Sequence, residues 1–106
     1  MAMTAAITQT GGVVAITLHG PADYSVVTLL LDTFAQARSA PGARRIVVDL
    51  ADVRFMDSSG LSAFISGFRF ARQDGLRFEV VNPVRSVQSL LEMTGVAHLF
   101  ATVDDD

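Results

Sequence analysis

The middle of the chain carries the pattern that most restricts its fold, a β-branched apolar run followed after one loop by an amphipathic helix. Ile46, Val47, Val48 and Leu50 form the run, which is typical of a strand covered on both faces inside a sheet. Residues 59–72 then repeat apolar side chains at helical spacing, and these are Leu61, Phe64, Ile65 and Phe68. A strand that leads into such a helix begins a crossover to a parallel neighbour. The centre of the chain therefore predicts an α/β fold around an interior strand.

A hairpin is predicted before this unit. Residues 13–18 place Val14, Ile16 and Leu18 on one face of a strand. The Gly11-Gly12 pair in front of it tolerates positive φ, as a tight turn to an earlier strand near residues 5–8 requires. The N-terminal part of the sheet is therefore expected to be antiparallel.

A first helix is predicted over residues 24–40. Its apolar positions recur at helical spacing, Asp23 is the candidate N-cap, and Pro41-Gly42 ends it. Tyr24, the only tyrosine, starts this helix and is either a packed ring or a contact residue. This helix is expected to connect the hairpin to the central strand.

The C-terminal part repeats the alternation. Residues 77–81 read as a strand, Pro83 opens a loop, and a short third helix is closed by Gly95, with Val87, Leu90, Leu91 and Thr94 as its marker positions. An apolar patch follows at residues 96–100. Strands and helices in this order predict a single domain with a mixed sheet, an N-terminal antiparallel hairpin and covering helices.

Composition excludes several classes of function. The chain of 106 residues has eight arginines, no lysine and eleven acidic residues, and its net charge of −3 comes from the acidic tail 104–106 that follows the domain of residues 1–103. A body without basic excess is not expected to bind nucleic acid. No Cys is present, and His19 and His98 lie far apart, so we assign no metal and no cofactor. No apolar run approaches the length of a membrane span, and we expect a cytoplasmic protein.

Polar residues capable of chemistry gather between the central strand and the second helix. Asp57, Ser58 and Ser59 are preferred N-cap residue types, and a simple cap explains each of them. Gly60 in the first turn suggests that something approaches the backbone closely there. A helix N-terminus favours negative charge, so a phosphate on either serine would fit. Loops 20–23 and 55–60 both follow strand ends, where ligands usually bind in such sheets.

The segment Phe55-Met56-Asp57-Ser58-Ser59-Gly60-Leu61 resembles the signature of bacterial anti-sigma factor antagonists, which are small STAS-domain proteins. The resemblance extends across nearly the whole chain. It includes Gly20 and Asp23 after the second strand, Ile46-Val47-Val48-Asp49-Leu50 before the signature, Asn82-Pro83, and Leu91-Glu92-Met93-Thr94-Gly95. A STAS-like domain at residues 1–103 is therefore expected.

The resemblance implies partner switching. The unphosphorylated antagonist binds an anti-sigma factor, which is commonly also a serine kinase, and so frees the sigma factor for transcription. Phosphorylation of the serine after the signature Asp, here Ser58, reverses binding, and a protein phosphatase restores it. Ser59 is the competing position. The implied partner-binding residues are Asp23, Asp57, Ser58, Ser59 and Gly60.

One departure concerns the loop after the second strand. The family often has Gly-Glu-Leu-Asp there, whereas this chain has Gly20-Pro21-Ala22-Asp23. The lost carboxylate removes a contact to an arginine of the partner, and Pro21 stiffens the loop. Asp23 itself has a structural role as N-cap that can coexist with recognition.

The sequence also bears on two other kinds of function, an enzyme and a scaffold. An enzyme is not expected, because the chain lacks a Gly-x-Ser-x-Gly elbow, a Walker loop and a strand-linked Gly-x-Gly-x-x-Gly. A scaffold-type STAS module, as in a stressosome-like assembly, shares the signature and remains the alternative.

The second helix is also a candidate to contribute apolar residues to a docking surface. Phe70 is expected to face outward with Ala63 and Gly67, or else to pack beneath a neighbouring loop. Arg69 and Arg72 are expected to be solvated.

Overall fold

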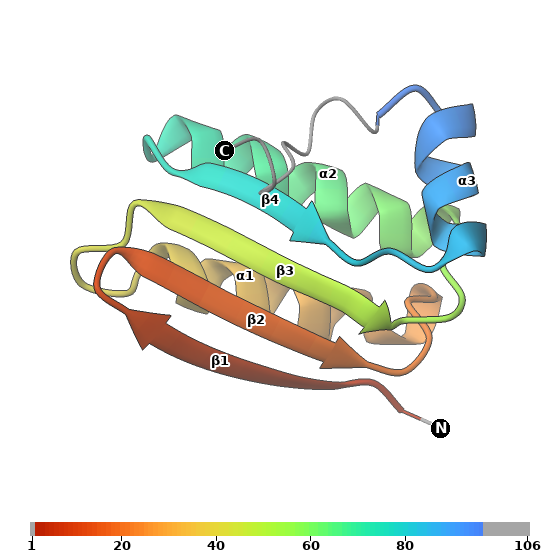
Figure 1. Cartoon of the computed structure of the whole chain (residues 1–106), viewed down its shortest axis with the longest axis horizontal. Coiled ribbons are helices and arrows are strands. Elements are labelled where there is room, and N and C mark those ends of the chain that lie inside the picture. The colour runs from red at the N-terminus through yellow and green to blue at the C-terminus, as the bar shows by residue number, and fades with distance from the viewer. Residues whose placement is uncertain (1, 97–106) are drawn as a thin grey trace.

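Four strands form one sheet in the order β1-β2-β3-β4 in the computed structural model, which describes residues 2–96 (Figure 1). They are β1 (Thr4–Thr10), β2 (Val13–His19), β3 (Arg45–Asp52) and β4 (Arg77–Val81). β1 and β2 pair antiparallel, and β2, β3 and β4 run parallel. The predicted α/β class, the mixed sheet and the N-terminal hairpin are confirmed.

Helices follow each of the three parallel strands, and those after β2 and β3 are the crossovers that the sequence predicts. The helical segments are the 3-10 turn η1 (Tyr24–Val26), α1 (Val27–Arg38), α2 (Ser58–Gln73) and α3 (Arg85–Met93). The predicted first helix thus begins as a 3-10 turn, and Asp23 caps it by accepting a hydrogen bond from the Ser25 amide at 3.0 Å. Arg69 and Arg72 on α2 are exposed, as predicted.

The expectation that the central strand is covered on both faces is wrong. Ile46, Val48 and Leu50 are fully buried, but Val47 is only partly buried and Ala51 is exposed. Figure 1 shows α1 and α2 on the same side of the sheet. The strand order follows the chain order, so both crossovers step in the same direction, and crossovers of one hand then place their helices on one face. β3 is interior, as predicted, but half of it faces away from the helices.

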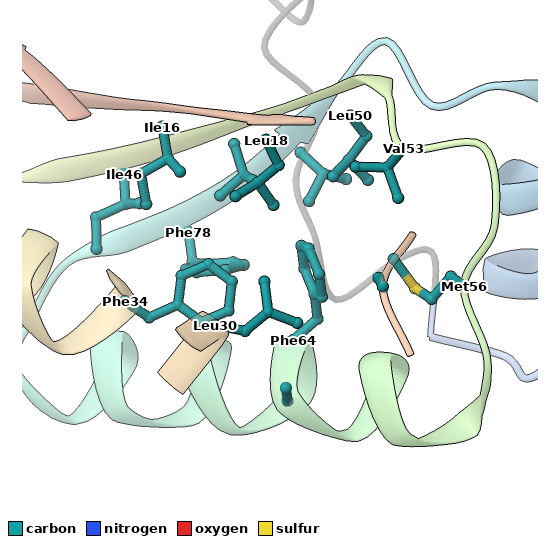
Figure 2. Packing of buried hydrophobic residues seen from close by; sticks show 14 of the residues in the cluster. Ile16, Leu18, Leu30, Phe34, Ile46, Leu50, Val53, Met56, Phe64 and Phe78 are labelled. Carbon is teal, nitrogen blue, oxygen red and sulfur yellow. The ribbon is translucent and has the colours of Figure 1, made fainter. Parts of the chain in front are cut away.

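The core lies between this face and the two helices. Figure 2 shows Ile16, Leu18 and Ile46 of the sheet pointing toward Leu30, Phe34 and Phe64 of the helices. The Phe34 ring packs edge-on against Phe64 and against Phe78, with both centroid distances at 5.2 Å. Edge-to-face pairs of this kind contribute stabilisation beyond that of burying their apolar surface. Of the stripe predicted on α2, Phe64 lies at the centre of this core, and Ile65 and Phe68 are packed at its edge.

An outward-facing surface of Ala63, Gly67 and Phe70 is not present. Ala63 is buried, and Gly67 lies directly against the Phe34 ring. Only Phe70 is exposed, and the Arg38 guanidinium of α1 stacks over its ring at 5.0 Å. The expectation for Ala63 and Gly67 is wrong because α2 packs with that face against α1, and not only against the sheet.

The end of β4 turns sharply into α3. Asn82 adopts a positive φ of 58°, which asparagine tolerates better than most residues, and Gly95 follows α3 with a φ of 74°. The third helix is confirmed. Residues 97–100 of the predicted apolar patch, His98 and the acidic tail 104–106 lie outside the described residues.

Gly67→Ala is expected to destabilise the protein although alanine favours helix. A Cβ at residue 67 would lie 2.6 Å from the Phe34 ring, which is itself held by two other rings. Overpacking costs about 1–3 kcal/mol, against a gain of about 1 kcal/mol in helix propensity. We expect a net loss of about 1 kcal/mol in the free energy of unfolding, measured by urea denaturation.

The exposed Ser62 of α2 provides the control. Ser62→Ala is expected to leave stability unchanged or slightly raised. An equal or greater stability of Gly67→Ala would contradict the packing described here.

Candidate functional site

The loops that follow β2 and β3 are joined into a short parallel bridge at the end of the sheet. Ala22 pairs with Met56, and the Ala22 amide donates to the Phe55 carbonyl at 2.9 Å. The Ala22 carbonyl in turn accepts a hydrogen bond from the Asp57 amide at 3.2 Å. The two loops singled out in the sequence therefore meet, and the loop after β2 supports the start of α2.

Asp57 is the N-cap of α2. Its Oδ1 accepts hydrogen bonds from the Ser59 amide at 2.9 Å and from the Gly60 amide at 3.0 Å. These two amides have no partner inside the helix, so the side chain satisfies donors that would otherwise stay open. The carboxylate also places its negative charge at the positive end of the helix dipole.

Gly60 is required by the approach of the neighbouring loop. It is buried, and a Cβ built on it would overlap the carbonyl oxygen of Ala22. The close approach inferred from the sequence thus comes from this chain's own backbone, and Gly60 has a structural role at the site.

The two serines differ in exposure. Ser58 is exposed, whereas Ser59 is partly buried. No hydrogen bond within residues 2–96 engages the Ser58 hydroxyl, and the site described here leaves it open to solvent. The geometry thus separates two positions that the sequence left equivalent.

Asp23 lies beside Asp57 in the bridged loops. Each Asp directly follows one of the two bridged residues, Ala22 and Met56. The Asp23 Oδ1 accepts from the Ser25 amide at 3.0 Å and from the Ser25 hydroxyl at 2.6 Å. Its predicted role as N-cap is confirmed, and the same geometry brings two carboxylates to one end of the sheet.

Two exposed aromatic rings lie in or directly next to these loops. Tyr24, directly after Asp23, is 80% exposed, and Phe55, two residues before Asp57, is 52% exposed. Tyr24 is therefore not a packed ring. The sequence does not predict that Phe55 is exposed, because Phe55 stands out there only as part of the signature. Its place in a loop with neither helical nor strand periodicity was the available signal.

The start of α3 lies against the same loop. The Ser86 hydroxyl donates to the carbonyl of Arg54 at 3.2 Å. Figure 1 shows α3, η1 and the start of α2 gathered at the end of the sheet to which β2, β3 and β4 point. Ser58, at the start of α2, thus lies on a surface built from three separate segments of the chain.

Residues 2–96 contain no group of three or more His, Asp or Glu side chains placed to hold a metal ion. His19 Nδ1 contacts Asp52 Oδ2 at 2.7 Å, an ion pair when the histidine is protonated, with both side chains about half exposed. Among the described helices, none combines the length and the hydropathy that crossing a membrane needs.

Comparison with known proteins gives consistent results. A family model described as the STAS domain matches residues 4–106. An anti-sigma F factor antagonist of Paenibacillus polymyxa is 29% identical over 98 residues, which cover 90% of this chain and 81% of that protein.

Solved structures share the fold. The anti-sigma factor antagonist SpoIIAA in its unphosphorylated form superposes with a TM-score of 0.78 at 20% identity, covering 96% of this chain and 90% of that one. The Bacillus cell fate determinant SpoIIAA in its phosphorylated form gives 0.71 at 19% identity, covering 96% and 93%. With its four-stranded mixed sheet, its helices and the family match over nearly its full length, the chain belongs to the STAS domain family.

Proposed function

We propose that this chain is an anti-sigma factor antagonist switched by phosphorylation of Ser58. In the unmodified state it binds an anti-sigma factor with serine kinase activity and so frees the sigma factor for transcription. Phosphorylation by that kinase ends the complex, and a protein phosphatase restores the binding form. All of these partners act in the cytoplasm, where we place the chain. The relative from Paenibacillus polymyxa is an anti-sigma F factor antagonist, and SpoIIAA has been solved in an unphosphorylated and in a phosphorylated form.

The observation that carries the proposal is the exposed hydroxyl of Ser58 at the start of α2. A kinase must reach the serine with a bound nucleotide, and the partly buried Ser59 is less accessible than Ser58. Asp57 holds the first turn of the helix through two amides, so the residue after it is presented in a fixed position. This arrangement supports Ser58 over Ser59 as the modified residue.

The cap also explains why a phosphate would act on binding more than on folding. Asp57 already occupies the amides of Ser59 and Gly60 that a phosphate would otherwise use. A phosphate on Ser58 carries about −1.5 to −2 charges and lies beside that carboxylate. It therefore projects to solvent and changes the charge of the surface, while α2 keeps its cap.

The exposed rings of Tyr24 and Phe55 supply the apolar part of the proposed partner surface. Exposed aromatic side chains next to polar groups are typical of residues that anchor a protein interface. Both rings extend from the bridged loops that hold Asp23 and Asp57. We therefore place the anti-sigma factor over this end of the sheet, with Asp23, Asp57, Ser58, Ser59 and Gly60 beneath it.

Incubation with the serine-kinase anti-sigma factor and ATP is expected to phosphorylate Ser58, as read by peptide mass spectrometry. Ser58→Ala should abolish the modification, and Ser59→Ala should leave it in place because its hydroxyl is not the acceptor. A phosphate found only on Ser59, or on neither serine, would overturn the assignment.

Ser58→Asp is expected to weaken binding to the anti-sigma factor at least about tenfold, or about 1.4 kcal/mol, whereas Ser58→Ala keeps it. The added carboxylate repels or displaces partner groups that approach Asp57. Its effect on the free energy of unfolding should stay within about 0.5 kcal/mol, because the position is exposed. Calorimetry and urea denaturation measure the two quantities.

The matched control is Gln73→Glu, which adds the same charge at the exposed far end of α2. It should leave partner affinity unchanged. Equal affinities for the wild type, Ser58→Asp and Ser58→Ala would rule out the switch.

Phe55→Ala and Tyr24→Ala are each expected to weaken partner binding about tenfold or more, since aromatic anchors dominate interface energies. Phe70→Ala is the control: that ring is 48% exposed, close to the 52% of Phe55, but it lies under Arg38 near the other end of α2. Surface plasmon resonance on the three variants tests the placement. Loss of binding with Phe70→Ala but not with Phe55→Ala would move the interface elsewhere.

A further inference from the structure

The outer edge of β1 is unusually open. β1 is an edge strand of the sheet and pairs only with β2 among the described strands. Within residues 2–96 no backbone hydrogen bond reaches its other side. Figure 1 shows this strand at the margin of the sheet with no helix over it. The strand therefore presents a row of backbone donors and acceptors to solvent.

Proteins usually block such an edge, and β1 carries none of the usual devices. Its sequence, Thr-Ala-Ala-Ile-Thr-Gln-Thr, has no charged residue, no proline and no glycine, and all seven residues stay in register with β2 without a bulge. The first 18 residues of the chain contain no charged side chain at all. β4 at the opposite edge is shorter and bears Arg77 and Glu79. An unblocked edge on one side only indicates a surface that is used.

We propose that the β1 edge joins two copies of this chain into a dimer with one continuous sheet. Antiparallel pairing about a two-fold axis at Ile7 places Ile7 opposite Ile7 of the second copy. Ala6 then lies opposite Thr8, Ala5 opposite Gln9 and Thr4 opposite Thr10. The strand is complementary to itself in this register, and all seven residues pair, as an isologous interface requires.

The side chains fit this register on both faces of the sheet. Ile7 is partly buried against the core on the helix side, and a second Ile7 would cover the part that is still exposed. On the other face, Thr4, Ala6, Thr8 and Thr10 are all exposed and small, so no bulky or charged group opposes the approach. The Gln9 amide is turned back to the Pro41 carbonyl at 2.8 Å and does not block the edge.

A second copy accounts for the edge better than an extended peptide from another protein. A peptide would need only an open edge. The pairing of Ile7 with itself and of the small Ala6 with the small Thr8 matters only when the strand meets a second copy. One strand pair covers less than the about 1,000 Å² expected of a stable interface, so the dimer should form and dissociate with concentration. Loops 20–23 and 53–57 contribute nothing to it, so the proposal is independent of partner switching.

Sedimentation velocity over a concentration series tests the dimer on the full chain. The wild type is expected to shift from the mass of one chain to that of two. In Ala6→Lys/Thr8→Lys, each new lysine lies directly opposite another lysine, and like charges placed opposite each other disfavour pairing. Both positions are exposed, so the variant should keep the fold, as checked by circular dichroism, and remain a monomer at every concentration.

Charge complementation distinguishes this register from a general loss of association. Ala6→Glu/Thr8→Glu should also be monomeric, and mixing it with Ala6→Lys/Thr8→Lys should restore a dimer of one copy of each. Gln36→Lys/Gln73→Lys carries the same added charge at exposed positions of the helices and should dimerise like the wild type.

A wild type that stays monomeric throughout would overturn the proposal. A lysine variant that still dimerises, or a mixture that fails to associate, would do the same. Assembly beyond a dimer that survives the lysine substitutions would also overturn it, and would favour the scaffold-type alternative over a small antagonist.

Discussion

The carbonyl of Ala22 is the contact on which the site depends. It accepts the Asp57 amide and lies so close to Gly60 that no side chain fits there. The loop after β2 and the start of α2 are thereby fixed against each other, and the carboxylate caps of the two helical segments come to one end of the sheet. Without this contact the serines would stand on a helix end whose position relative to Asp23, Tyr24 and Phe55 was not defined.

Asp57 and Ser58 have different roles at the start of α2. A helix N-terminus attracts negative charge, and Asp57 satisfies that preference permanently through the amides of Ser59 and Gly60. Ser58 is thereby left as an exposed hydroxyl with no structural hydrogen bond in the described part of the chain. A residue that the fold does not use can gain and lose a phosphate without altering the fold, which is the property that a reversible interaction surface needs.

The order of the strands has a wider consequence. Because the parallel strands follow one another across the sheet, both crossover helices lie on one face, and β1 is left at the margin without a helix. Among the described strands the order does not reverse, and a reversal of strand order is where open α/β sheets usually bind ligands. The loops at the strand ends and the open edge of β1 are two surfaces that this arrangement leaves available for interaction.

Local patterns in the sequence determined the elements and their caps. Three features follow from interactions between near neighbours along the chain, and each is found in the structure. They are the helical spacing of Leu61 and Phe64, the β-branched run at residues 46–48 and the cap role of Asp23. The side on which an element is buried does not follow in this way. Val47 faces away from the helices, and Gly67 lies against Phe34, because strand order and helix packing decide which faces meet. The difference in exposure between Ser58 and Ser59 likewise became visible only in three dimensions, since contacts between segments distant in the chain set it.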